Sequence, residues 1–341
     1  MNHQELLHTL RHTQDLPDEG LVALLGSRDA GVQGELHACA REVAQERFGK
    51  EVYLRGLVEW SNVCRNDCLY CGIRKSNISL ARYSLGADEV LGCADAVNRS
   101  GIRTVVIQGG ENPAGALWLL PVVAEIRRRW PEMAITLSLG ELPFDTYKAL
   151  REAGADRYLL RHETATSAHY ARLHPAGMSL EHRLACLDEL RRLGFQVGMG
   201  MMAGSPYQSL EHVLADIRLI QRFGPEMIGI GPFVPQKDTP LGTFPAGDPA
   251  LTLKLYSILR LMLPDSLIPS TTALATVLPD GCKKGILAGA NVIMPNFTPA
   301  QVSGSYQLYN HKSRQELETI KKDLASIGYA ASASRGDYHK N

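Results

Sequence analysis

The sequence is poor in cysteine, carries no excess charge of either sign and has no long apolar run. Seven cysteines in 341 residues are an odd number, which does not suit a disulfide framework, so we expect the reduced thiols of an intracellular protein. Basic and acidic residues number 36 each, which argues against nucleic-acid binding. No segment is apolar enough to span a bilayer, and residues 1–8 lack the apolar part of a secretory signal. These absences predict a soluble cytoplasmic protein without a membrane or nucleic-acid partner.

Three of the seven cysteines lie within eight residues. Cys64, Cys68 and Cys71 form the pattern C-x3-C-x2-C, and short cysteine runs of this kind hold iron–sulfur clusters. No fourth cysteine is nearby, so one iron of a 4Fe–4S cluster would stay open for a small molecule. An open coordination position is typical of a catalytic metal site. The spacing therefore favours a catalytic cluster.

Two other interpretations of the cysteines remain open. A zinc-stabilised binding module would need a fourth ligand, but no second C-x2-C or H-x3-H pattern follows, and His162 and His182 are distant in sequence. An iron–sulfur electron carrier would have four protein ligands rather than three. Zinc would leave the protein colourless after reconstitution with iron and sulfide. A spectral change on adding a cofactor to the reduced cluster would separate an enzyme from a carrier.

The chain alternates strand and helix patterns after a helical start. Residues 3–48 have the periodicity of helices. Eight apolar strand segments follow, separated by helical segments, which predicts an α/β protein with a closed (β/α)8 barrel of the TIM type and an N-terminal helical extension. The predicted strands are residues 52–60, 104–108, 134–138, 156–161, 196–202, 227–231, 268–272 and 290–294.

This pattern divides the chain into three parts. We expect an N-terminal helical cap at 1–48, the barrel at 49–300, and a C-terminal turn, helix and tail at 301–341. Residues 330–341 are polar, and we expect them to be frayed. The cysteine run follows the first strand, and active sites of such barrels lie at the C-terminal ends of the strands.

Polar residues alternate along strands whose side chains should fill an apolar interior. Arg55 shares a strand face with Glu59, and Arg157 shares one with Arg161 and Glu163. Tyr158 and Leu160 suit the helix side of the same strand. Because buried charges are costly unless paired or used, the pattern predicts a polar cavity at the top of the barrel, lined by cations. The alternative is that these side chains face outward or pair with one another.

A glycine pair follows the second strand in the run Gln108-Gly109-Gly110-Glu111. Glycines let the backbone approach a ligand closely, and a carboxylate beside them accepts hydrogen bonds from an ammonium group. Alone, this run is typical of an ordinary turn. After the second strand of a barrel with a three-cysteine loop, it resembles the motif with which radical S-adenosylmethionine enzymes bind the amino group of that cofactor.

Several motifs together resemble one family. The sequence resembles the HydE family, the radical S-adenosylmethionine (SAM) maturases of [FeFe]-hydrogenase, and is less similar to methylornithine synthase and biotin synthase. The likeness covers about residues 50–312 and keeps the chain order. It lies in residues 61–74, 136–141, 156–165, 228–233, 238–241, 291–296 and 306–309.

The resemblance implies roles for specific residues. Cys64, Cys68 and Cys71 would hold one 4Fe–4S cluster. SAM would be bound by Tyr70, Gly109, Gly110, Glu111, Ser138, Glu163 and Arg183. The substrate cavity would be lined by Arg55, Gln108, Thr136, Arg157, Arg161, Thr271, Thr272 and Tyr306. Some members carry a second cluster on C-terminal cysteines, but the last cysteine here is Cys282, so no second cluster is expected.

The resemblance also implies an activity. Reductive cleavage of SAM would give a 5′-deoxyadenosyl radical that acts on the sulfur of a small cysteine-bound iron cyanide/carbonyl complex. That complex would come from the partner maturase HydG, the product would pass toward HydF, and reduced ferredoxin or flavodoxin would donate the electron. The alternative is a radical SAM mutase that acts on an amino acid, as methylornithine synthase does.

Overall fold

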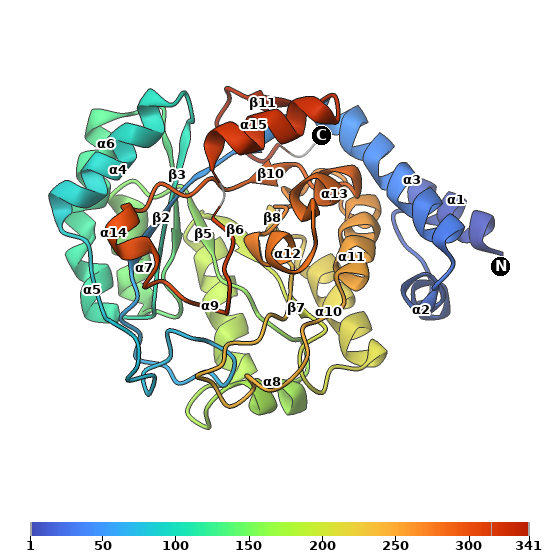
Figure 1. Ribbon diagram of the computed structural model, residues 1–341, viewed down its shortest axis with the longest axis horizontal. Coiled ribbons are helices and arrows are strands. Elements are labelled where there is room, and N and C mark those ends of the chain that lie inside the picture. The colour runs from blue at the N-terminus through green and yellow to red at the C-terminus, as the bar shows by residue number, and fades with distance from the viewer. Residues whose placement is uncertain (1, 315, 340–341) are drawn as a thin grey trace.

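The computed structural model describes residues 2–314 and 316–339, and its central feature is a parallel β-barrel (Figure 1). Six of its strands form one continuous hydrogen-bonded sheet in the order β2-β3-β4-β5-β6-β8. The strands are β1 (Glu51–Leu54), β2 (Gly56–Ser61), β3 (Thr104–Gly109), β4 (Ala134–Ser138), β5 (Arg157–Leu159), β6 (Gln196–Met199), β7 (Met202–Ala203), β8 (Met227–Ile228), β9 (Gly231–Pro232), β10 (Val292–Ile293) and β11 (Ala330–Ser332).

Short strands and single β-bridges close this sheet into a barrel. β1 pairs with β10 in parallel, and Leu57 of β2 forms a parallel bridge to Asn296. Where the seventh strand of the barrel is expected, the structure has single β-bridges, from Leu267 to Met227 and from Pro269 to Val292. The predicted (β/α)8 barrel is therefore confirmed, although its seventh strand is shorter than the predicted 268–272 segment.

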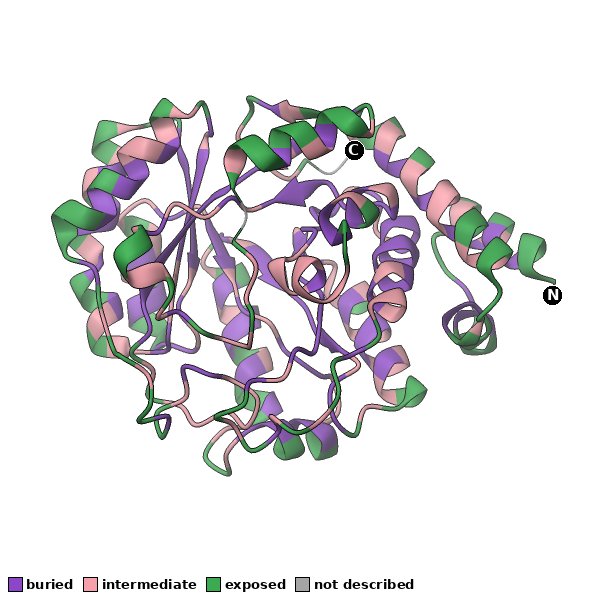
Figure 2. Cartoon of the chain, viewed as in Figure 1, coloured by how far each residue is buried: buried purple, intermediate pink, exposed green. Residues whose placement is uncertain are grey.

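Helices surround the barrel, with their exposed faces outward and the buried strands inside (Figure 2). Along the chain they are α1 (His3–Thr13), α2 (Asp18–Gly26), α3 (Ala30–Phe48), α4 (Ala87–Arg99), α5 (Pro113–Trp118), α6 (Leu120–Arg129), α7 (Phe144–Glu152), α8 (Ser167–Leu173), α9 (Leu180–Arg192), α10 (Leu210–Phe223), α11 (Pro249–Met262), α12 (Thr272–Val277), α13 (Gly281–Leu287), α14 (Ala300–Ser303) and α15 (Leu317–Ser326). None of the helices in the described part of the chain is long and apolar enough to cross a membrane.

The first three helices pack on one side of the barrel. α3 lies along α11, while α2 contacts α10 (Figure 1). Asp29 caps α3 by accepting hydrogen bonds from the backbone of Gly31 and Val32. The buried leucines of these helices, such as Leu10 and Leu21, join the same hydrophobic core as the barrel. The boundaries placed after residues 48 and 300 stay predictions.

The alternation along β5 divides its side chains as the sequence indicates. Tyr158 points to the helices, where its ring packs edge-on against Tyr147 and Phe195. Leu160 joins the hydrophobic core. The prediction that these two residues face the helix layer is confirmed. Leu159 between them, and Arg157 and Arg161 on either side, therefore lie on the opposite face of the strand, toward the barrel interior.

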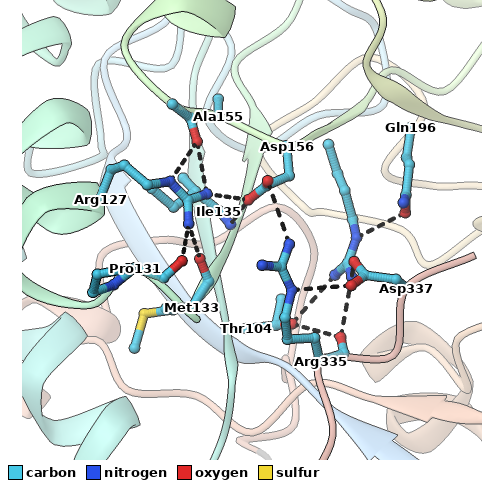
Figure 3. A network of polar contacts seen from close by, with 12 residues as sticks. Thr104, Arg127, Pro131, Met133, Ile135, Ala155, Asp156, Gln196, Arg335 and Asp337 are labelled. Atoms are coloured by element: carbon cyan, nitrogen blue, oxygen red, sulfur yellow. Dashed lines mark hydrogen bonds and ion pairs between the residues drawn. The ribbon is translucent and has the colours of Figure 1, made fainter.

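The C-terminal residues are ordered rather than frayed, which corrects the expectation for 330–341 within the described part of the chain. β11 pairs with β1, and the following residues close the barrel at the N-terminal ends of its strands. The carbonyl oxygen of Arg335 accepts a hydrogen bond from Thr104 Oγ1 there, and the carboxylate of Asp337 accepts one from Arg157 (Figure 3). The polar groups of this tail bind buried residues inside the barrel, such as Arg157. The composition of the tail cannot reveal these long-range contacts.

Candidate active site

The cysteine loop lies at the C-terminal end of β2 and is held by backbone contacts on several sides. Gly72 N donates to Leu308 O at 2.9 Å, and Leu69 N donates to Leu173 O at 2.9 Å. A side chain at Gly72 would collide with the carbonyl of Gln307. The post-barrel turn therefore packs directly against this loop, and only glycine fits at the contact.

The three thiols are half-buried and lie close enough for their charges to interact. Burial raises the pKa of Cys71 to about 12, and burial with the charges of Cys71 and Cys64 raises the pKa of Cys68 well above its usual range. Binding of a metal cluster favours the thiolate forms of such thiols. No three His, Cys, Asp or Glu side chains in the described chain form a site for a single metal ion. This donor set fits a cubane, in which each thiolate bonds a different iron.

Glu111 lies directly beside the cysteine loop. Its Oε1 accepts from Arg65 Nε at 2.8 Å, and its Oε2 accepts from the backbone N–H of Glu141 at 2.7 Å. Arg65 N in turn donates to Glu111 O at 2.8 Å. Gly140 has φ +76, and a side chain there would collide with the Glu111 carboxylate. Each carboxylate oxygen keeps a lone pair, so Glu111 can still accept from an ammonium group.

Arg183 is a buried residue of α9, not an exposed one. Its Nε lies 2.5 Å from Glu141 Oε1, and its Nη1 donates to Arg161 O at 2.9 Å. Both partners of the ion pair have side chains under 10% exposed, at 9% and 5%. The ion pair links α9 to the loop after β4, which contributes the backbone donor to Glu111. Sequence reasoning missed Glu141, although it lies three residues beyond the predicted Ser138.

Glu163 has a positive φ of 67, an uncommon conformation for a residue with a side chain. Arg161 Nη2 lies 2.6 Å from Glu163 Oε2. Coulombic attraction by Arg161 holds the pKa of Glu163 below its usual value although burial opposes this. Between them, His162 points away, and its Nε2 contacts Asp216 Oδ1 of α10 at 3.0 Å with both side chains fully buried. This buried pair holds the backbone next to Glu163. Asp216 was missed because no motif or pattern in the sequence marks it.

Several predicted substrate residues carry buried polar atoms without a partner. Among the described residues, Nε and Nη2 of Arg55 and Oγ1 of Thr136 have no hydrogen bond. Tyr306 is 1% exposed and lies within hydrogen-bonding reach of the Gln108 side chain. Unpaired buried polar groups cost free energy unless a ligand or water satisfies them. These atoms therefore suit a polar ligand inside the barrel.

The structure corrects the placement of Arg157. Its guanidinium lies at the N-terminal end of the barrel, opposite the cysteine loop, and Nη2 contacts Asp337 Oδ1 at 2.6 Å. It also donates to the carbonyl oxygens of Arg335 and Gly336, each at 3.0 Å. Arg157 begins β5 whereas Arg161 lies beyond its end, so about four residues of extended chain separate them. Arg157 does not line a cavity at the top.

Three further predicted residues have clear local roles. Thr271 is the N-cap of α12, and Thr272 is the first residue of that helix, so neither belongs to a strand. Thr271 Oγ1 lies 3.3 Å from Tyr256 Oη. Tyr70 in the cysteine loop contacts His174 Nε2 through its hydroxyl at 3.3 Å.

The other predicted residues lie at the ends of the central strands. Ser138 ends β4, and Gly109 ends β3. A side chain at Gly110 would collide with Val63 O and approach Cys64 Cβ, so the glycine allows the two loops to touch. The structure thus brings the cysteine loop, Glu111 and the end of β4 together at one end of the barrel.

Comparison with known proteins agrees with this geometry. Residues 58–220 match the Radical SAM superfamily. The chain is 41% identical over 329 residues to the [FeFe] hydrogenase maturase subunit HydE of Thermotoga maritima, covering 96% of this chain and 92% of that protein. The crystal structure of methylornithine synthase (PylB) superposes with a TM-score of 0.86 at 25% identity, covering 96% of this chain and 97% of that one.

A solved structure of HydG, a maturase of the [FeFe]-hydrogenase, shares the fold. It has a TM-score of 0.82 at 21% identity and covers 97% of this chain and 76% of that one. The radical SAM superfamily implies a 4Fe–4S cluster and SAM as cofactors, and the cysteine loop and its surroundings fit both. The chain is a radical SAM enzyme and belongs to the HydE family of [FeFe] hydrogenase maturases.

Proposed function

We propose that this enzyme acts on a small cysteine-bound iron cyanide/carbonyl complex during assembly of the [FeFe]-hydrogenase active site. The observation that carries the proposal is the cysteine loop placed over a barrel interior with unsatisfied buried donors, in a chain 41% identical to a HydE subunit. When bound, the reduced cluster and SAM supply a 5′-deoxyadenosyl radical. The protein itself supplies binding groups, their orientation and the exclusion of water.

The residues divide between the two ligands. Cys64, Cys68 and Cys71 would hold the cluster. Glu111 would accept hydrogen bonds from the amino group of SAM, with Arg65 and the backbone of Glu141 fixing its carboxylate. The remaining SAM contacts would come from Tyr70, Gly109, Gly110, Ser138, Glu163 and Arg183.

The substrate would lie inside the barrel below SAM. Arg161, at the end that carries the cysteine loop, would attract an anionic complex, and Thr136 Oγ1 is a buried hydroxyl without a protein partner. Arg55 precedes β2 and lies near Arg157 and Asp337, so it would contact the complex from the opposite end of the barrel. The remaining substrate contacts would come from Gln108, Thr271, Thr272 and Tyr306. Arg157 is left out because the C-terminal tail satisfies it.

We also propose a single cluster per chain, the complex made by HydG as substrate, HydF as acceptor of the product and reduced ferredoxin or flavodoxin as electron donor. The last cysteine, Cys282, is a buried residue of α13, so no later thiol is available for a second cluster. Iron and sulfide analysis of reconstituted protein should give about four of each per chain. A stable content near eight would contradict the single cluster.

The test of the substrate is anaerobic. The reconstituted protein is reduced, mixed with SAM and the synthetic iron complex, and followed by EPR and mass spectrometry. The expected product is an adenosylated sulfur species that is lost in the Cys64→Ala, Cys68→Ala and Cys71→Ala variants. If SAM is cleaved and the complex is recovered unchanged, the proposed substrate is wrong.

A mutase acting on an amino acid is the second candidate. The structural match to methylornithine synthase over 96% of the chain supports it, and a lysine-like substrate also carries charges that arginine can bind. The same assay with L-lysine in place of the iron complex separates the two. Formation of a rearranged amino acid would favour the mutase.

A further inference from the structure

A cavity of about 680 Å³ opens beside the candidate site, between the segment 303–314 and Lys237. In Figure 1 this red segment leaves α14, runs toward the cysteine loop and returns to α15. The volume is in the range of small-molecule sites. Its floor includes Tyr306 and Asn296, and Tyr306 also reaches the Gln108 side chain. The cavity therefore adjoins the barrel interior where the substrate is proposed to lie.

The charged side chains that line this cavity are all of one sign. Lys237, Lys312 and Arg314 are cations, and no acidic residue is among the lining residues. Arg314 is anchored, since it donates to Ser303 Oγ at 2.7 Å and its Nε lies 3.2 Å from Glu316 Oε1, a carboxylate outside the cavity lining. A cavity lined by cations concentrates small anions.

Lys312 lies at the inner edge of the cavity. Its side chain is only 14% exposed, and its ammonium forms an ion pair with the 1% exposed carboxylate of Glu59. The same ammonium lies 3.3 Å from Tyr306 O and 4.7 Å from the centre of the Tyr306 ring. Asn296 Nδ2 donates to the other Glu59 oxygen at 3.1 Å. Glu59 lies opposite Gln108 in the register of β2 and β3, so Lys312 connects the cavity with the barrel wall.

We propose that this cavity is the entrance for an anionic substrate and that Lys312 is a substrate-binding residue there, shared between Glu59 and the anion. A lysine has a flexible stem and rotatable donors, so its ammonium can turn from one anion to another. The ligand is a small molecule with a carboxylate or a comparable anionic group. The inference rests on the proposed function, because it takes the barrel interior as the place of reaction.

Two substitutions should act in opposite directions. Lys312→Met removes the cation and should weaken binding about 10-fold or more, the range of one charge-assisted hydrogen bond. Glu59→Gln removes the competing carboxylate, frees the ammonium and should tighten binding. A residue that only stabilises the fold would weaken binding in both variants. The double variant Glu59→Gln/Lys312→Met leaves no unpaired buried charge and should bind more weakly than Glu59→Gln alone.

Binding is measured by anaerobic calorimetry on the reconstituted full-length protein with SAM, without reductant. The probes are the cysteine-bound iron cyanide/carbonyl complex and L-lysine. The control is Lys283→Met, because Lys283 pairs with Asp280 on α13, outside the cavity lining. It should leave both affinities unchanged.

The outcomes decide between the two proposals. If the complex binds with equal affinity to wild type, Lys312→Met and Glu59→Gln, the entrance is wrong while the proposed substrate stands. If L-lysine binds, the complex does not, and the variants shift lysine affinity in opposite directions, the entrance stands and the proposed substrate falls. If neither probe binds wild-type protein at millimolar concentration, the entrance is overturned for both substrate classes.

Discussion

Replacing Asp337 by alanine tests whether the C-terminal tail seals the barrel in solution. The Arg157 side chain is 0% exposed, and its Nη2 lies 2.6 Å from Asp337 Oδ1. Removing one partner of a buried ion pair costs about 3–5 kcal/mol. The Asp337 side chain is 27% exposed, and Arg157 keeps two carbonyl acceptors in the tail. We therefore expect a loss of about 2–3 kcal/mol in the free energy of unfolding.

This loss converts into a measurable shift in melting temperature. With about 2.1 cal/mol/K per residue over 341 residues, the entropy of unfolding is about 0.7 kcal/mol/K. The Tm of Asp337→Ala should fall by about 3–4 °C. Calorimetry and urea unfolding of cluster-free protein measure it. Asp337→Asn keeps a hydrogen-bonding oxygen and should lose less.

The matched control is Asp95→Ala. Asp95 pairs with Arg99 on α4 at 2.8 Å, but its side chain is 45% exposed. Exposed pairs contribute about 0–1 kcal/mol, so this variant should change the free energy of unfolding little. If Asp337→Ala is as stable as Asp95→Ala, the tail does not satisfy Arg157 in solution, and residues 330–339 are frayed as their composition indicates.

Three other predictions concern the site. Glu141→Gln removes the charge beside buried Arg183 and should weaken SAM binding about 10-fold or more, as measured by EPR titration of the reduced cluster. An unchanged affinity would contradict the role of Glu141 in positioning Arg183 and Glu111. Gly72→Ala would place a methyl group against Gln307 O and should lower iron content after reconstitution; full iron content would argue against tight packing of the turn. Burial lowers the pKa of His174 from 6.5 to about 4. The folded state therefore keeps its full stability above pH 6.5 and loses up to about 3 kcal/mol of unfolding free energy as the pH falls from 6.5 through 4. Urea unfolding of cluster-free His174→Gln should show a flatter pH dependence.

The sequence by itself determined the barrel and the chemical character of the site. The alternation of apolar strands with amphipathic helices leaves few other architectures, because parallel strands need helical crossovers. The C-x3-C-x2-C spacing limits the ligands to a small metal cluster, since those thiols are adjacent whatever the fold. The placement of the cysteine loop after the first strand follows from the same reasoning, because active sites of barrels gather at that end.

Tertiary structure decided which polar residues meet. Arg157 and Arg161 share one strand face in sequence, yet the first is bound by the tail at one end of the barrel and the second by Glu163 at the other. Period-two alternation gives the face of a side chain but not its height along the barrel axis. Nor could it reveal the partners of Arg157 in the tail.

The same limit explains the residues that sequence reasoning missed. Glu141 and Asp216 act through contacts 42 and 54 residues away in the chain, with Arg183 and His162 respectively. Such pairs form because a buried charge or polar group needs a partner, and only the folded barrel brings that partner into reach. The local sequence pattern therefore determined the barrel and the three cluster-binding thiols. The buried side-chain pairs around the site, such as Arg183 with Glu141, follow from tertiary packing.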